Sequence, residues 1–223
     1  MPLNLPKPII YLITSGATTI QTTPDSSDFS QLLLLIKTAV AAEIPLLQIR
    51  EKALSTRVLY DLTGRALEIS RGTSTRILVN DRLDVALAAG AAGVQLTSQS
   101  LPANVVRGAT PDNFLIGVSI HSVTEATDAE SGGADFVVFG PVFETESKRK
   151  FGPPQGLTKL ADVATAVSGL PVIAIGGIAV ENVRECLDHG AAGIAAITLL
   201  NDSNNLATTV SKIQRLGATK TNG

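Results

Sequence analysis

The chain has 223 residues, a formal net charge of −2, 44% hydrophobic residues and 17% charged residues. This length is ordinary for one large domain, and this charge favours neither nucleic acid nor an anionic membrane surface as a partner. Cys186 is the only cysteine. The sequence therefore excludes an intramolecular disulfide and a cysteine-bound metal cluster.

The N-terminal residues lack the basic and apolar regions of a signal peptide. The longest uncharged stretch, 85–106, contains Gly, Pro, Ser, Gln and Asn, which is not the pattern of a membrane span. We therefore expect a cytoplasmic protein with no membrane partner. The sequence leaves homo-oligomer formation open.

Short apolar runs recur along the whole chain and are continuous in hydrophobicity, as expected of strands that are covered on both faces. In chain order they are 9–13, 46–49, 77–79, 93–96, 115–118, 136–139, 172–175 and 193–197. Between them lie segments with the apolar spacing of amphipathic helices. The clearest of these are 29–43, 56–70, 124–131, 157–168 and 180–189.

Alternation of strand and helix predicts a parallel sheet with right-handed crossovers. Eight strands favour closure into a (β/α)8 TIM barrel, which we expect to form one domain over residues 1–223. Its core would run from about 9 to 216, and 217–223 would be a flexible tail. A doubly wound open sheet is the alternative, but no Gly-x-Gly-x-x-Gly follows the first strand.

In such a barrel, function lies at the carboxyl ends of the strands, so the residues after each apolar run are the candidates for a site. After the second run, Gln48, Arg50 and Lys52 alternate with other residues and would share one face of the strand. Two cations and an amide suit a phosphate or pyrophosphate group. Basic side chains that simply reach solvent are the alternative.

The third and fifth runs end in further polar residues. Asp81, after Asn80, could hold Mg²⁺, although either residue could instead cap the next helix. Ser119 and His121 alternate onto one face, and His121 could transfer a proton or could simply be hydrogen-bonded near a helix start.

The last three strand ends suggest a phosphate ester site. Thr145 and Ser147 supply hydroxyls and Lys148 a cation, in a stretch that reads either as a loop over the site or as a solvated basic loop. Gly176-Gly177 and Ile197-Thr198 follow the seventh and eighth runs, where phosphate sites recur in this fold. Cys186 lies within a helical segment and is expected to be packed rather than nucleophilic.

Five motifs in order resemble the thiamine-phosphate synthase family and its relative TenI, the thiazole tautomerase, over about residues 9–200. The motifs are Gln48-Ile-Arg-Glu-Lys52, Asn80-Asp-Arg82, Gly117-Val-Ser-Ile-His121, Gly140-Pro-Val-Phe-Glu-Thr-Glu-Ser-Lys148 and Ile175-Gly-Gly-Ile178. The resemblance implies small phosphorylated heterocyclic substrates and a coupling reaction that releases pyrophosphate.

The resemblance also implies roles for individual residues. Those that match the binding site for the pyrimidine diphosphate are Gln48, Arg50, Lys52, Asn80, Ser119 and Lys148. Those that match the site for the thiazole phosphate are Thr145, Ser147, Gly177, Ile197 and Thr198. Asp81 matches a Mg²⁺ ligand, and Arg50, Lys52 and Lys148 would neutralise the leaving group.

One stretch departs from the synthase pattern. Synthases usually carry His-Leu-Gly-Gln-x-Asp after the fourth strand, whereas this chain has Gln95-Leu-Thr-Ser-Gln-Ser100, so that Ser100 replaces the second carboxylate. This stretch is more similar to TenI. If the chain acts as TenI does, His121 moves the proton and no metal is needed. Another phosphate-binding barrel, such as a sugar-phosphate epimerase, and a non-catalytic barrel that binds a thiamine precursor remain as further alternatives.

Overall fold

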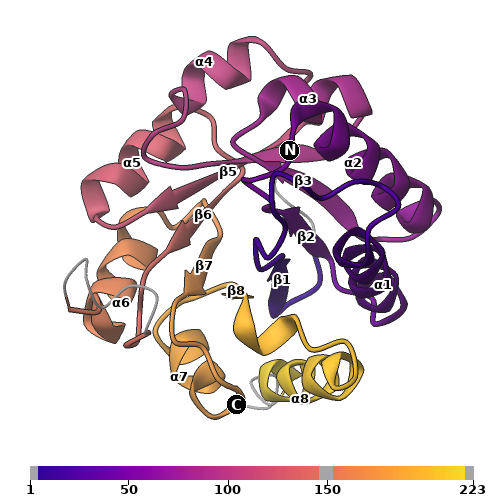
Figure 1. Ribbon diagram of the computed structural model, residues 1–223. Coiled ribbons are helices and arrows are strands. Elements are labelled where there is room, and N and C mark those ends of the chain that lie inside the picture. Colours follow the sequence, from indigo (N-terminus) through magenta and orange to yellow (C-terminus); the bar gives the residue numbers. More distant parts are fainter. Residues whose placement is uncertain (1–4, 146–152, 219–223) are drawn as a thin grey trace.

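The computed structural model describes residues 5–145 and 153–218, and in this part the chain forms a closed barrel of parallel strands ringed by helices (Figure 1). Each strand pairs with the next, and the eighth pairs with the first. The strands are β1 (Ile9–Ile13), β2 (Leu46–Ile49), β3 (Arg76–Asn80), β4 (Gly93–Leu96), β5 (Leu115–Ile120), β6 (Phe136–Phe139), β7 (Val172–Ile175) and β8 (Gly193–Ala196). The closed order confirms the predicted (β/α)8 barrel over the open doubly wound sheet.

The predicted strand bounds differ from the observed ones at the ends of three strands. β3 begins one residue earlier than predicted and ends one residue later, β5 continues to Ile120, and β8 stops at Ala196. Ile197 therefore lies just beyond β8 rather than within it.

Helices fill the connections between the strands. They are α1 (Ser27–Ala41), α2 (Thr56–Ser70), α3 (Leu83–Ala89), α4 (Ala103–Gly108), α5 (Val123–Ser131), α6 (Gly156–Ala166), α7 (Val183–Asp188) and α8 (Leu206–Ala218), with short 3-10 helices η2 (Val180–Asn182) and η3 (Thr198–Leu200). The sequence analysis did not identify α3, α4 or α8. None of the described helices is long and apolar enough to cross a membrane.

The end of α8 corrects the predicted start of the C-terminal tail. The helix continues through Ala218, two residues past the expected core boundary. Gly217 packs against the start of the barrel, where an added Cβ would lie 2.1 Å from Pro8 Cδ. Residue 217 therefore belongs to the packed domain, whereas 219–223 lie outside the described residues.

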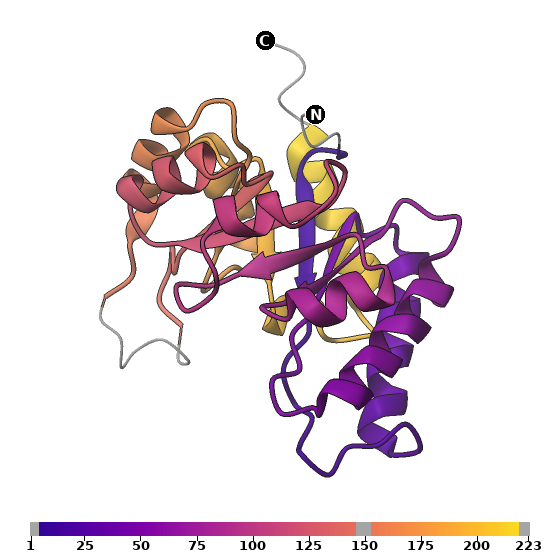
Figure 2. The same ribbon diagram turned by 90° about the horizontal axis from the view of Figure 1, so that it is seen from above.

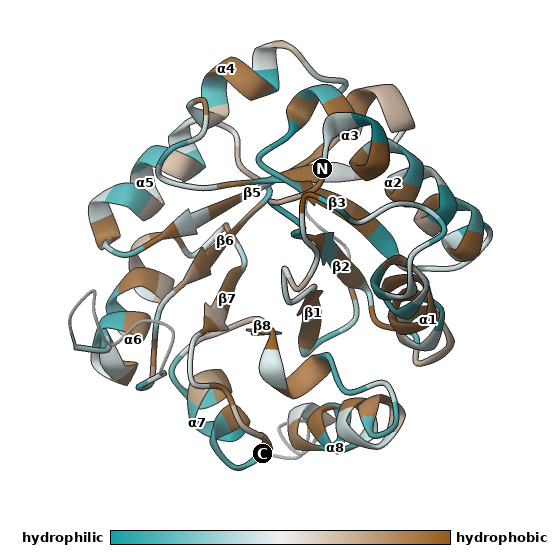
Figure 3. Cartoon of the chain, in the orientation of Figure 1, coloured by the Kyte–Doolittle hydropathy of each residue, from teal (hydrophilic) through white to brown (hydrophobic). Residues whose placement is uncertain are grey.

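Apolar side chains fill two shells on either side of the barrel wall. On β1, Ile9, Tyr11 and Ile13 join a cluster inside the barrel, whereas Ile10 and Leu12 join the larger cluster between the strands and the helices. This alternation is the period-2 geometry of a strand with both faces covered. Figure 3 shows the result, with hydrophobic strands inside and hydrophilic residues on the outer sides of the helices.

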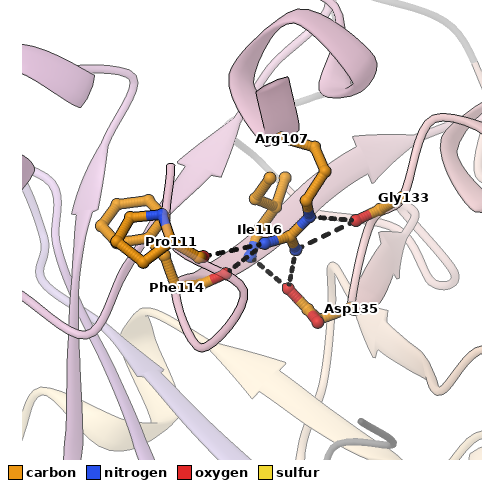
Figure 4. A network of polar contacts seen from close by, with 6 residues as sticks. All are labelled: Arg107, Pro111, Phe114, Ile116, Gly133 and Asp135. Carbon is orange, nitrogen blue, oxygen red and sulfur yellow. Dashed lines mark hydrogen bonds and ion pairs between the residues drawn. The ribbon is translucent and has the colours of Figure 1, made fainter. Parts of the chain in front are cut away.

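A polar network ties the amino ends of β5 and β6 together (Figure 4). Arg107 of α4 forms an ion pair with Asp135, with Nη2 2.7 Å from Oδ2, and donates to the carbonyl oxygens of Gly133 and Phe114. The same carboxylate accepts the N–H of Ile116 in β5 at 2.7 Å. Both charged side chains are largely buried. Their bonds link α4, β5 and the segment before β6 at the end of the barrel opposite the carboxyl strand ends.

We expect Asp135→Asn to lower the free energy of unfolding by about 1–3 kcal/mol, because it removes a charge-assisted acceptor and leaves buried donors poorly paired. The measurement is urea denaturation followed by circular dichroism. Asp61→Asn is the matched control, since Asp61 pairs with the exposed Arg65 on α2 and should change stability by less than about 1 kcal/mol. Equal effects of the two substitutions would contradict this role for the network.

Candidate active site

The predicted site residues that the structure describes gather at one rim of the barrel. Arg50 and Asp81 follow β2 and β3, Ser119 lies near the carboxyl end of β5, and Gly177 follows β7. Because all strands are parallel, these ends meet on one side, where the loop that follows β1 also lies (Figure 2). The predicted residues Ser147 and Lys148 lie outside the described residues.

The Gln48–Lys52 segment rises from the barrel interior to the surface. Gln48 is 2% exposed inside the barrel, and its Nε2 donates to Asn80 Oδ1 at 2.8 Å. Gln48 Oε1 is buried and has no partner among the described residues. The strand ends at Ile49, so Arg50 and Lys52 lie in the following loop rather than on the strand face that we predicted.

Glu51, which the sequence analysis passed over, anchors the loop between β1 and α1. Its carboxylate is buried and accepts the N–H of Gly16 at 3.0 Å, and the N–H and hydroxyl of Thr18 at 3.2 and 2.7 Å. The backbone of Arg50 is fixed in turn, because its N–H donates to the buried Thr14 hydroxyl at 2.8 Å. These bonds hold the first loop beside the basic segment.

Asp81 contacts Ser100 rather than capping a helix. Its backbone has φ 60°, a left-handed conformation that Asp tolerates better than most residues. Helix α3 begins after Arg82 without a side-chain cap, which removes the helix-cap interpretation for Asn80 and Asp81. The Ser100 hydroxyl donates to Asp81 Oδ1 at 2.5 Å and also accepts the Thr97 N–H at 2.7 Å.

Asp81 and Ser100 are the candidate side-chain ligands for a metal ion. The described residues hold no group of three or more His, Cys, Asp or Glu side chains suited to a metal. Mg²⁺ binds proteins through as few as one or two carboxylates and takes its other ligands from water and substrate phosphates. The Asp81 carboxylate with the Ser100 hydroxyl therefore fits an ion that a bound phosphate helps to hold.

A second polar network lies deeper, inside the barrel. The buried Tyr11 hydroxyl donates to Gln95 Oε1 at 3.1 Å, and Gln95 Nε2 donates to Ser119 Oγ at 3.1 Å. Burial raises the pKa of the Tyr11 hydroxyl well above its ordinary range, so Tyr11 stays protonated. Sequence reasoning missed Tyr11 and Gln95, although a polar residue within an apolar strand is a signal for such a network.

His121 lies just beyond β5, is exposed, and has a defined orientation. Its Nδ1 lies 2.5 Å from the carbonyl oxygen of Gly140, at the end of β6. A carbonyl oxygen only accepts, so Nδ1 carries the hydrogen and Nε2 of the neutral ring keeps its lone pair. The backbone N–H of His121 donates to Glu125 Oε2 at 2.5 Å. The Nδ1 contact thus fixes the ring and leaves Nε2 as the nitrogen that a proton-transfer role would use.

The glycine pair after β7 is required by packing. Gly176 and Gly177 have φ 95° and 66°, and a Cβ on Gly177 would lie 2.5 Å from the Glu144 carbonyl oxygen. The segment after β6 therefore packs directly against these glycines. Substitutions at Gly177 would disturb this packing as well as any ligand contact.

Backbone N–H groups for an anion remain at the ends of β7 and β8. Within residues 5–145 and 153–218, no hydrogen-bond acceptor contacts the N–H of Gly177 or that of Thr198, the first residue of η3. Asn201 holds this end in position, since its Nδ2 donates to Ile13 and Ile197 carbonyl oxygens at 2.7 Å each. The β8 end is thereby tied to the β1 end.

Cys186 of α7 is packed, as the sequence predicts. Its side chain is fully buried, and burial, with the nearby Glu185 charge, raises the pKa of the thiol to about 12. The thiolate form that a nucleophile needs is therefore absent near neutral pH.

Comparison with known proteins identifies the family. Residues 17–200 match the family model described as thiamine monophosphate synthase. The thiamine-phosphate synthase of Methanoculleus marisnigri is 40% identical over 190 residues, which cover 85% of this chain and 90% of the relative. That of Chlorobium phaeovibrioides is 45% identical over 156 residues, which cover 70% of this chain and 74% of the relative.

A solved structure agrees with these relatives. Thiamine phosphate pyrophosphorylase from Pyrococcus furiosus superposes with a TM-score of 0.79 at 30% identity, covering 95% of this chain and 96% of that one. The motifs at the strand ends, the closed barrel and these similarities all lead to the same assignment. The chain belongs to the thiamine monophosphate synthase family.

Proposed function

We propose that this protein is a thiamine-phosphate synthase, which joins hydroxymethylpyrimidine diphosphate to thiazole phosphate and releases pyrophosphate. Family membership supports this activity. The observation that carries it is the set of Gln48, Arg50, Lys52 and Asp81 at the ends of the adjacent strands β2 and β3. An amide, two cations and a carboxylate at or just beyond the ends of two adjacent strands suit a diphosphate that must leave with its charge neutralised.

The pyrimidine diphosphate would lie over the β2 to β5 side of the rim. Gln48, Asn80 and Ser119, whose side chains lie at the inner side of the rim, would form hydrogen bonds with the pyrimidine ring. Arg50 and Lys52, with Lys148 outside the described residues, would bind the diphosphate. Negative charge grows on this group as its bond to the pyrimidine methylene breaks, so cations held beside it favour the transition state.

The thiazole phosphate would lie over the β6 to β8 side. The N–H groups of Gly177 and Thr198, which no acceptor among the described residues contacts, suit its phosphate, and Ile197, Thr145 and Ser147 would complete the site. The two substrates would then meet across the barrel mouth, with the thiazole nitrogen facing the methylene carbon. The new carbon–nitrogen bond forms as pyrophosphate departs.

Asp81, with Ser100 beside it, would hold Mg²⁺ together with the substrate diphosphate. A bound Mg²⁺ would neutralise charge on the departing pyrophosphate. Because Ser100 supplies no charge, we expect a weaker metal site than two carboxylates would give.

A second candidate function is TenI-like isomerisation of the thiazole phosphate without a metal. The orientation of His121 favours it, since the bond to Gly140 engages Nδ1 rather than Nε2, the nitrogen that would accept and return a proton. A barrel that binds a thiamine precursor without turnover is the remaining alternative. In each case we infer a cytoplasmic protein, which agrees with the single buried cysteine.

Two substitutions separate the synthase from the tautomerase. In a synthase, Asp81→Asn and EDTA should nearly abolish coupling, whereas His121→Ala should have a smaller effect. In a tautomerase, His121→Ala should lower isomerisation about 10²–10⁴-fold, the usual contribution of a positioned proton-transfer group, and Asp81→Asn should do little. Both purified variants are to be assayed side by side for coupling and for thiazole isomerisation.

The matched control for these assays is Asp84→Asn, because Asp84 is an exposed carboxylate on α3 whose partner is the Arg82 side chain. Coupling that survives both Asp81→Asn and EDTA would rule out the metal-dependent synthase. Binding of both precursors without turnover under any metal would point to the non-catalytic alternative.

Ser100→Asp should reduce the Mg²⁺ concentration needed for half-maximal coupling, because it adds a second carboxylate beside Asp81. We expect a change on the order of tenfold, which corresponds to about 1.4 kcal/mol. Ser100→Asn is the uncharged control. A Mg²⁺ titration of initial rates that is identical for the parent and Ser100→Asp would show that position 100 does not contribute to the metal site.

The phosphate site is tested better at Thr198 than at Gly177, because Thr198 is exposed. Thr198→Asp would bring a carboxylate next to the expected anion and should weaken binding of thiazole phosphate by about 1–2 kcal/mol. Thr198→Asn has nearly the same shape without the charge and should have the smaller effect. Isothermal titration calorimetry measures both, and equal affinities would refute the proposed phosphate position.

A further inference from the structure

Among the apolar side chains inside the barrel lies a chain of polar contacts that leads to the candidate site. It runs from Tyr11 on β1 through Gln95 on β4 to Ser119 on β5. We infer that Tyr11 and Gln95 are positioning residues that fix the Ser119 hydroxyl as a hydrogen-bond donor toward a ring-nitrogen acceptor of the pyrimidine substrate. This inference rests on the proposed function.

The orientation of the Gln95 amide follows from its neighbours. Its Nε2 lies 3.5 Å from the Leu96 carbonyl oxygen, and a carbonyl can only accept. The amino end of the amide therefore faces Leu96 and Ser119, and the oxygen end faces the Tyr11 hydroxyl. Tyr11 stays protonated at ordinary pH and can act as the donor to this oxygen.

The orientation of the Ser119 hydroxyl follows from that of Gln95. Ser119 Oγ accepts the hydrogen of Gln95 Nε2 on its inner side, at 3.1 Å. A serine hydroxyl has one hydrogen, and it must point away from the donor that the oxygen already accepts. Ser119 is only partly buried near the carboxyl end of β5, so this hydrogen is available on the rim side.

Packing holds the amide in this orientation. Gln95 is 2% exposed, and Tyr11 is fully buried with its ring edge-on to Phe136 at a centroid distance of 5.6 Å. Gly117 provides the space, because a Cβ there would lie 2.4 Å from both Gln95 Oε1 and Phe136 Cζ. A side chain enclosed so closely has little freedom to turn over and reverse its donor and acceptor ends.

The donor and acceptor roles in these hydrogen bonds do not change with pH near neutrality. Among the described side chains that contact the Gln95 amide, Tyr11 is the one that can ionise. The amide itself cannot. The donor to the substrate is therefore present over the whole ordinary pH range.

Gln95→Glu tests the inference, because a carboxylate accepts from both neighbours and makes Ser119 donate inward. The probe is free hydroxymethylpyrimidine, titrated by calorimetry from about pH 5 to about pH 8. Position 95 is buried, and burial raises the pKa of a carboxyl above its usual range and into this interval. We expect the variant to bind on the order of tenfold more weakly at neutral pH. Its affinity should recover as the pH falls, because the protonated acid can again donate to Ser119.

Ser119→Ala is the matched control and should bind weakly at every pH, whereas the parent should show no such recovery. Thiazole phosphate affinity should be unchanged in all three proteins. If the parent binds the pyrimidine and Gln95→Glu shows no pH-dependent loss, the positioning role is overturned. If the parent itself neither binds the pyrimidine nor couples it, the proposed function fails instead.

Tyr11→Phe provides a second test in case Gln95→Glu does not fold, since it keeps the ring against Phe136 and removes only the hydroxyl. We expect it to raise KM for the pyrimidine diphosphate several-fold with little change in kcat, because it frees the Gln95 amide to turn. An unchanged KM would contradict the role of Tyr11, and a loss of kcat alone would show that the network does not act through substrate binding.

Discussion

The parallel ladder between β1 and β8 closes the barrel, and the site depends on that closure. Ile9 pairs with Gly193 at the start of this ladder, where a Cβ on the glycine would lie 2.0 Å from the Ile9 carbonyl oxygen. Only glycine permits so close an approach of the two strands. With the ring closed, residues as distant in sequence as Arg50 and Thr198 must share one rim.

Side chains with no expected ligand contact hold the rim of the barrel in place. Glu51 fixes the loop after β1, Asn201 joins the ends of β8 and β1, and Gln95 supports Ser119 from below. Each of these partners forms bonds to a segment far away in the chain. The precision that a site needs thus comes from side chains that bind other parts of the chain rather than a ligand.

The strands were predictable because they are buried on both faces and their apolar runs are short and continuous. Helices α3 and α4 were missed because seven and six residues are too few to show a helical period. Helix α8 was also missed. Its buried Leu206, Val210 and Ile213 stand apart in a largely polar stretch that follows a polar loop.

Within the site, alternation predicted one shared strand face for Gln48, Arg50 and Lys52 but could not show that the strand stops at Ile49. The role of Glu51 was out of reach, because its partners Gly16 and Thr18 meet it only in the folded chain. Sequence pattern also assigned Gly177 to ligand binding alone. The demand for space beside Glu144 depends on tertiary packing and has no local signal.

The Arg107–Asp135 network lies at the amino ends of the strands, with the whole barrel between it and the rim. This separation matters for how such a protein can evolve. Selection for a warmer or cooler habitat can strengthen or weaken the network without altering any residue expected to meet a substrate. Thermal adaptation and chemistry can therefore change independently within one small domain.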